Sequence, residues 1–277
     1  MSSLEGSVFP IKSKEEYEKE TQEILNLIPG WVDPYPKPQI VDHEGFHVVR
    51  DDLIDVGSKA RFASYFVKTC KYKEIVYGSA PACGYAPISI SHLCTLYGKK
   101  AIFYMAERKI ENLHPYQKRA LDLGGEIRWI PDGMMVVCER RAKDYVAQNP
   151  EERVILPMGV KHPTVTACII QTCRNLGIQP DHVWSVGSSG TLSGGLQRAF
   201  PNAEVHVVET GHKMTPDEIG RAIWHRSPYT FFKDVKKADE PPFPSAKNYD
   251  AKCWSIMKEY YKTHEKPKMV LMWNVGY

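Results

Sequence analysis

Short apolar runs alternate with longer amphipathic stretches along most of this chain. The short runs are rich in Val, Ile and aromatic residues, which predicts strands at 47–50, 73–77, 100–105, 126–129, 153–156, 182–186, 204–208 and 268–272. The stretches between them repeat apolar residues at helical spacing and predict helices near 59–69, 84–97, 114–123, 138–147, 163–175, 191–199, 215–224 and 249–261. A regular alternation of buried strands and helices favours an α/β fold whose parallel sheets are covered on both faces.

Two segments depart from this alternation. Residues 1–35 predict a charged helix that ends at Pro29-Gly30, followed by an extended stretch rich in proline. Residues 226–248 mix proline, charged and aromatic side chains, which predicts a long surface loop of the kind that often has a function.

Composition then narrows the class of protein. The 277 residues are 43% hydrophobic and 25% charged, which suits one large or two smaller globular domains. Lys and Arg number 36 and Asp and Glu 33, so the net charge of +3 does not require a nucleic-acid partner. No apolar run is long enough to span a membrane, and the seven cysteines show no regular spacing of the kind that indicates disulfide pairs. We therefore expect a cytoplasmic protein without a membrane partner.

The strongest candidate site is the run Gly187-Ser188-Ser189-Gly190-Thr191. It follows a predicted strand directly and opens a predicted helix. Glycines let the backbone turn so that several N–H groups face one anion, and the helix N-terminus and the hydroxyl groups add to that site. Neither GxxxxGK[ST] nor GxGxxG is present, so the run predicts a phosphate site of another kind. The alternative is an ordinary Gly/Ser-rich turn.

The second candidate is Lys59, which follows a Gly-Ser turn and starts a helix with apolar residues. Burial and the positive helix end would both lower the pKa of this amine, as an imine-forming lysine requires. An isolated lysine in a first helical turn is more commonly exposed. Lys59 together with the phosphate run and the α/β alternation nevertheless suits pyridoxal phosphate, which a lysine would hold as a Schiff base.

The same residues carry a resemblance to a known family. The chain resembles the fold type II pyridoxal-phosphate enzymes, the tryptophan synthase β-subunit superfamily, and within it the branch with 1-aminocyclopropane-1-carboxylate deaminase and D-cysteine desulfhydrase. Residues 50–62, RDDLIDVGSKARF, are similar to the branch's RDDL…GGNKxRKLE segment, which places the Schiff-base lysine at Lys59. Residues 187–191 match its GSGGT phosphate loop, and 156–163, LPMGVKHP, are similar to its IPxGxxxHPxG stretch.

The resemblance also implies an architecture. It predicts two three-layer α/β domains with the cofactor in the cleft between them. Residues 1–66 and 151–277 would form the large cofactor-binding domain, and 67–150 the small one. A homodimer is expected on the same basis.

One loop departs from the family pattern. The family has SxGN or GGIQSN after the strand that follows the lysine helix, and its polar atoms bind the substrate carboxylate. Here the loop contains Ser79, Ala80, Cys83 and Gly84, and Tyr85 stands where the family has Asn beside the cofactor. We expect these residues to bind a substrate that differs from that of the deaminase. Cys83 is either a nucleophile or, more simply, a packed side chain.

The partner of the cofactor's ring nitrogen affects the reaction type. A carboxylate there strengthens electron withdrawal by the ring, whereas a neutral group favours elimination and replacement. The neutral candidate is Asn274, in the C-terminal strand, and the acidic candidate is Glu209, after the strand at 204–208. The sequence leaves both open. It offers no metal motif: His43 and His47 are spaced HxxxH, but in a stretch that alternates like a strand rather than on a helix.

Three functions agree with these residues. The first is a lyase that acts on an amino acid or related amine through a Lys59 Schiff base, by elimination, deamination or decarboxylation. The second applies decarboxylation or elimination to an amino acid attached to a larger molecule, such as a modified nucleotide in DNA. It is favoured by the altered loop and by the basic, aromatic tract at 225–237 within the 225–248 segment. The third is a cofactor-binding module without catalysis, which the presence of Lys59 argues against.

Overall fold

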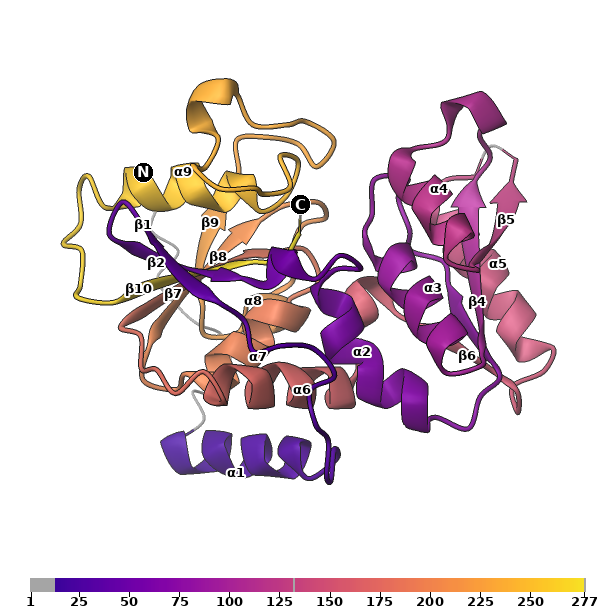
Figure 1. The fold of residues 1–277 in the computed structure, drawn as a ribbon, viewed down its shortest axis with the longest axis horizontal. Helices are drawn as coiled ribbons and strands as arrows, with labels where there is room; N and C mark the ends of the chain where they lie inside the picture. The colour runs from indigo at the N-terminus through magenta and orange to yellow at the C-terminus, as the bar shows by residue number, and fades with distance from the viewer. Residues whose placement is uncertain (1–12, 132, 277) are drawn as a thin grey trace.

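The chain folds around two separate sheets. The computed structural model describes residues 13–131 and 133–276. The larger sheet has the strand order β1-β2-β10-β7-β8-β9, and the smaller has the order β5-β4-β3-β6. Figure 1 shows the two sheets side by side, with the smaller one formed by the middle of the chain. The strands of the larger sheet are β1 (Ile40–His43), β2 (Phe46–Arg50), β7 (His182–Gly187), β8 (Glu204–Glu209), β9 (Ile223–Arg226) and β10 (Val270–Asn274).

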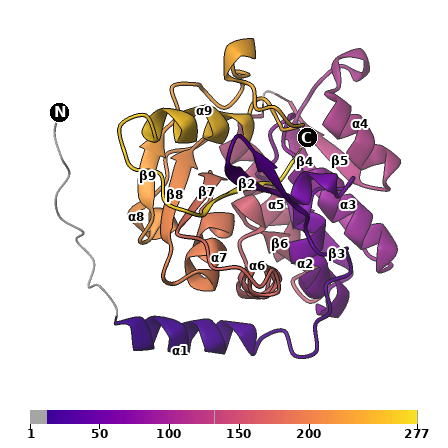
Figure 2. The same ribbon diagram turned by 60° about the vertical axis from the view of Figure 1, so that its left-hand side comes forward.

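Helices cover both faces of the larger sheet. On one face lie α2 (Ser58–Thr69), α6 (Pro163–Arg174) and α7 (Thr191–Ala199), and α9 (Ala251–Tyr260) covers the other (Figure 1). The helix expected near the N-terminus is α1 (Lys14–Leu25), which packs outside α6 and lies at the edge of the molecule in Figure 2. Each face has its own apolar core, with Trp273 on the α2 side and Trp184 on the α9 side. The result is a three-layer α/β arrangement, as expected.

The smaller sheet repeats this arrangement. Its strands are β3 (Glu74–Tyr77), β4 (Lys100–Ala106), β5 (Glu126–Ile130) and β6 (Arg153–Leu156), all parallel. Its helices are α3 (Ala86–Leu96), α4 (Pro115–Asp122) and α5 (Met135–Ala147), with α5 on the face opposite α3. Because β6 pairs with β3, this sheet extends past residue 150, where the sequence placed the end of the small domain. Sequence pattern identifies a strand but does not say which sheet it joins.

Two elements differ from the sequence expectation. The first is β1, which pairs antiparallel with β2 at the edge of an otherwise parallel sheet. The connecting residues Glu44 and Gly45 both have positive φ, of 56° and 76°, as a tight hairpin turn requires. The second is the helix expected at 215–224. This prediction is wrong, because the helix α8 (Pro216–Ile219) stops at Gly220, whose φ is +62°, and the strand β9 then pairs parallel with β8.

The segment after β9 has the predicted loop character. A short 3-10 turn, Lys237–Asp239, is its regular element before α9. No helix in the described part of the chain is long and apolar enough to cross a membrane.

Candidate active site

A cavity of about 600 Å³ lies where loops from both sheets meet. Its wall combines the loop after β3, the loop after β7, the start of α2 and the residues after β10. These segments follow the carboxyl ends of parallel strands, the usual position of ligand sites in α/β proteins. The volume falls within the range of small-molecule sites in proteins.

Lys59 lies in the cavity wall, in the first turn of α2. Burial lowers the pKa of its amine, and the nearby carboxylate of Asp250 opposes that effect. The helix begins after Gly57, whose φ of +79° turns the chain into the helix. The Tyr85 ring packs against this glycine so closely that an added Cβ would lie 2.6 Å from its ring carbons. Lys59 therefore belongs to the N-terminal turn of α2, and burial favours the neutral form of its amine.

The run 187–191 joins β7 to α7 and lines the same cavity. Gly190 is the residue before the helix, with a φ of +69°, and the Ser189 and Thr191 hydroxyl oxygens lie 3.0 Å apart. The first N–H groups of α7 have no partners within the helix and open toward this loop. Ser188 also lines the wall. The loop thus offers both hydroxyl groups and a helix N-terminus to one anion.

Gly159 packs over this loop. A Cβ at this position would lie 1.8 Å from the Ser189 Oγ, and the glycine has a φ of +71°. Its N–H donates to the Tyr77 hydroxyl at 3.2 Å, which connects the end of β3 to the stretch 156–163. The glycine of the LPMGVKHP stretch is therefore required by close contact with the run at 187–191.

The substrate loop predicted after β3 also lines the cavity. Ser79, Ala80, Cys83 and Gly84 are all in its wall, together with Tyr85. The Ser79 hydroxyl donates to Glu139 Oε1 at 2.7 Å, and the Tyr85 hydroxyl donates to the Asp55 carbonyl at 2.9 Å. Both hydroxyl groups are thus committed to protein partners, while the Tyr85 ring contributes a flat wall beside Lys59.

Cys83 is half-buried, and burial raises the pKa of its thiol. The effect of burial outweighs that of Arg108 and Lys252, which would lower the pKa. A thiol with a raised pKa is a weak nucleophile at neutral pH. This favours the packing role for Cys83 over the nucleophilic one.

The cavity also contains an acidic group, Asp250, which precedes α9 and is 1% exposed. Burial raises the pKa of Asp250 to about 8, against opposing effects of the Val275 backbone and of Lys59. Neither of its carboxylate oxygens has a well-formed hydrogen bond from the described residues. A buried carboxylate in this state needs a proton or a cationic partner.

The two residues predicted for the ring nitrogen lie elsewhere. The Asn274 amide accepts from the Ser245 hydroxyl at 2.8 Å and donates to the Pro244 carbonyl at 2.9 Å. Glu209 accepts from the Met214 N–H at 2.8 Å and from the Trp224 indole at 3.2 Å. Neither residue is part of the cavity wall. The assignment of Asn274 or Glu209 to the ring nitrogen therefore stays a prediction. Asp250, in contrast, is a residue of the cavity wall.

The fold of the chain is similar to that of solved proteins. No family model matches the sequence. The structure is similar to that of an ACC deaminase homologue, with a TM-score of 0.77 and 14% identity over 92% of this chain and 94% of that one. It is also similar to the processed form of threonine deaminase isoform 2 from Solanum lycopersicum, with a TM-score of 0.72 and 13% identity over 97% of this chain and 86% of that one. The chain has the fold of the fold type II pyridoxal-phosphate enzymes.

One curated protein is also similar in sequence. The glycyl-dTMP PLP-dependent decarboxylase of Pseudomonas phage M6 is 23% identical over 216 residues, which cover 68% of this chain and 77% of that protein.

Sequence reasoning missed Asp250. The residue lies in a Tyr-Asp-Ala-Lys run at the start of a helix, where an acidic side chain is common and attracts no notice. Only the fold brings it to the cavity that holds Lys59. The side chains of Arg108 and His212 in the wall were missed for the same reason, whereas Phe231 and Phe232 belong to the aromatic tract at 225–237 that stands out in the sequence.

Proposed function

We propose that the chain is a pyridoxal-phosphate-dependent lyase that acts on an amino acid or related amine. The observation that carries the proposal is the meeting, in one cavity, of a lysine with a lowered pKa and a loop that can bind a phosphate. Bound pyridoxal phosphate supplies an electron-withdrawing ring that stabilises negative charge on the carbon beside the substrate amine.

The residues of the cavity fit this cofactor. Gly187, Ser188, Ser189, Gly190 and Thr191 would hold the phosphate through N–H and hydroxyl groups. Tyr85 would lie beside the cofactor as a flat side chain. Asp250 would face the ring nitrogen, because a protonated ring gives the carboxylate the cationic partner that it lacks among the described residues. This choice favours strong electron withdrawal by the ring.

Lys59 would hold the cofactor through its amine, and that amine would afterwards move a proton. A neutral amine is needed for the first role, and burial supplies it. With a substrate amine bound in the cavity, the Lys59 amine would remove or add a proton at the carbon beside that amine. Ser79, Ala80, Cys83 and Gly84 would shape the substrate side of the cavity and exclude water.

The absorption spectrum of the purified protein tests the proposal. Protein given pyridoxal phosphate should show a visible band that borohydride removes, and mass spectrometry should then find the label on the Lys59 peptide. Lys59→Ala should lose the label and at least about 10³-fold of any turnover, in the range that a catalytic acid–base group contributes. A colourless protein that takes up no cofactor would contradict the proposal. Full turnover in Lys59→Ala would contradict the catalytic assignment of this residue, and cofactor uptake by the wild type with no turnover of any amine would support the non-catalytic alternative.

A specific set of observations favours the second substrate class, an amino acid attached to a nucleotide. The relative from phage M6 is named for a glycyl-dTMP substrate. In this chain the cavity wall also contains Arg108 and His212, together with Phe231 and the 74% exposed Phe232. Cationic and aromatic side chains at a cavity rim suit phosphate and base, respectively.

Competition between substrates tests this second proposal. Glycine and glycyl-dTMP should be offered to the same holoenzyme, with carbon dioxide release as the measurement. Preference for the nucleotide, lost in Phe232→Ala and Arg108→Ala, would support it. Equal turnover of glycine and glycyl-dTMP would contradict it, without affecting the proposal of cofactor chemistry at Lys59.

We also propose that the protein is a cytoplasmic homodimer. All seven cysteines are free thiols, which agrees with a reducing compartment. The dimer rests on the family resemblance alone, and light scattering on the holoenzyme tests it.

A further inference from the structure

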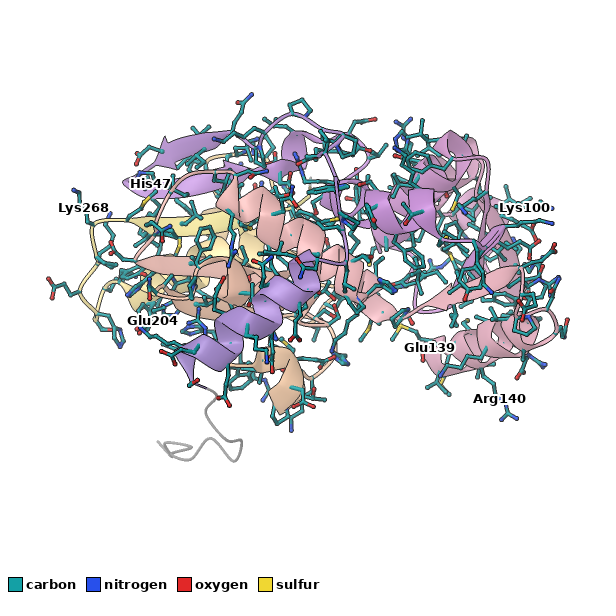
Figure 3. The ribbon with its side chains drawn as sticks, turned by 90° about the horizontal axis from the view of Figure 1, so that it is seen from below. His47, Lys100, Glu139, Arg140, Glu204 and Lys268 are labelled. Atoms are coloured by element: carbon teal, nitrogen blue, oxygen red, sulfur yellow. The ribbon has the colours of Figure 1, made fainter. Side chains whose placement is uncertain are left out.

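Three potential metal ligands gather at the end of the larger sheet far from the cavity. His182 begins β7 and pairs with Glu204, which begins β8, and His206 follows two residues later on the same face of β8. Figure 3 shows Glu204 at the end of the molecule opposite Lys100 and Glu139, which belong to the small domain. The cluster is therefore separate from the cofactor site proposed above.

The donor atoms have the spacing of a metal site. Glu204 Oε1 lies 3.0 Å from His206 Nε2 and 3.6 Å from His182 Nε2, and the donor atoms of the three residues all lie within 4.8 Å of one another. In a tetrahedral zinc site with bonds of about 2.0–2.1 Å, neighbouring donor atoms stand roughly 3.3 Å apart. The two measured separations lie on either side of that value.

The orientation of His206 adds an independent observation. Its side chain is fully buried, yet Nε2 has no hydrogen-bond partner in the described structure despite the nearby Glu204 oxygen. A ring nitrogen aimed directly at the carboxylate would form that bond. This buried nitrogen therefore remains available to another partner, such as a metal ion.

The other ring nitrogens are already held. His206 Nδ1 lies 3.0 Å from His225 Nε2, and His182 Nδ1 lies 2.7 Å from the Tyr261 hydroxyl oxygen. Histidines that bind metals usually donate the second N–H to such an outer partner, which leaves the facing nitrogen free for the ion. Trp184 stacks on the His206 ring with centroids 4.0 Å apart and fixes its plane.

We infer that His182, Glu204 and His206 form a binding site for a divalent transition metal, with Zn²⁺ as the best match. Two imidazoles and one carboxylate are ligands that zinc accepts, and water would complete four-coordination. The ligands lie on the neighbouring strands β7 and β8, and His182 also contacts Tyr261, the residue directly after α9. The ion would therefore strengthen the contact between that helix and the sheet.

Metal binding by the full-length protein tests this inference. Protein stripped with a chelator should be dialysed against Zn²⁺, and bound zinc measured by mass spectrometry, with the thermal midpoint recorded alongside. One equivalent should bind and raise the midpoint. Substitution with Co²⁺ should give the visible absorption of a tetrahedral site.

Variants locate the ion. His182→Gln and Glu204→Gln should fold, because both side chains are partly exposed. Loss of an outer-shell partner typically weakens metal binding about 10–100-fold, and these variants, which lose a direct ligand, should weaken zinc binding by more than that. His92→Gln, a half-buried histidine on α3, is the matched control and should keep full binding. Absence of bound zinc, or equal binding by all three variants, would overturn the inference. Lys59→Ala should leave zinc binding unchanged, so failure at one site is separable from failure at the other.

Discussion

Lys59 and Asp250 come from distant parts of the chain, yet both contribute to one buried cavity. Burial disfavours the charged form of each group, so the pKa of the lysine is lowered and that of the aspartate is raised. For the proposed cofactor, the neutral amine suits attack on an aldehyde, and Asp250 holds a proton that it could share with the ring nitrogen. Burial therefore sets the protonation state that each group would present to the proposed cofactor.

Asp250 makes the stability of the cofactor-free protein depend on pH. Its pKa is about 8 in the folded chain and 3.8 for the ordinary side chain, so the folded state holds the additional proton between these values. Stability contributed by this proton is present below about pH 4 and is lost as the pH rises through 8. Relative to Asp250→Asn, the wild type should lose about 2 kcal/mol of unfolding free energy between pH 6 and pH 8. Urea unfolding at both pH values measures this difference, and parallel pH profiles would refute the assignment.

Cys83 provides a second test at this scale. Because burial raises the pKa of its thiol, alkylation at pH 7 should be slower than that of free cysteine, and Cys83→Ser should keep turnover within about threefold of wild type. Mass-spectrometric labelling rates give the first measurement and steady-state kinetics the second. Loss of turnover by Cys83→Ser, with unchanged cofactor absorbance, would restore the nucleophilic role.

The sequence carried part of this information at the residue scale. Lys59 and 187–191 stand out because glycine, lysine and hydroxyl side chains occur at a strand end and at helix starts. Asp250 does not stand out, because its importance comes from burial beside residues that only the fold brings near. Asn274 and Glu209 show the converse, since hydrogen bonds within the protein occupy both outside the cavity wall.

At the scale of elements, the turn between β7 and α7 depends on Gly190. An added Cβ would lie 2.4 Å from the Glu218 carbonyl oxygen, and the φ of +69° disfavours any other residue. Gly190→Ala should therefore weaken pyridoxal-phosphate binding at least tenfold, measured by absorbance titration. Gly194→Ala is the matched control, because nothing lies within 4 Å of its added Cβ. It should bind normally and gain about 0.5–1 kcal/mol of stability from its place in the helix. Equal binding by the two variants would contradict the phosphate assignment.

Elements were predictable where local pattern and burial agree. The strands other than β1 and β9, and most helices, occur within a few residues of the expected ranges, because each of these strands is a short apolar run and each helix has a periodic buried face. The stretch 215–224 was misread because its helical composition continues past Gly220, while pairing with β8 makes Ile223–Arg226 a strand. Such non-local pairing has no signal in the stretch itself.

At the scale of the whole molecule, loops from both sheets line the cavity. Lys59 and the run 187–191 belong to elements of the larger sheet, while the loop after β3 belongs to the smaller. Alternating elements suggest two α/β units, but strand order and the extension of the smaller sheet to Leu156 require the fold. The ligands at His182, Glu204 and His206 likewise come together only through the register of β7 against β8.

A ligand that contacts both domains should stabilise them together. Pyridoxal phosphate at about 1,000 times its dissociation constant should add about 4 kcal/mol to the unfolding free energy and raise the thermal midpoint in a single transition. Pyridoxal, which lacks the phosphate, reaches Lys59 but leaves 187–191 without its anion, so it should give a much smaller increase. Differential scanning calorimetry of wild type with each compound measures both effects. Equal increases would show that 187–191 does not bind the phosphate, and an increase confined to one of two transitions would show that the cofactor contacts one domain alone.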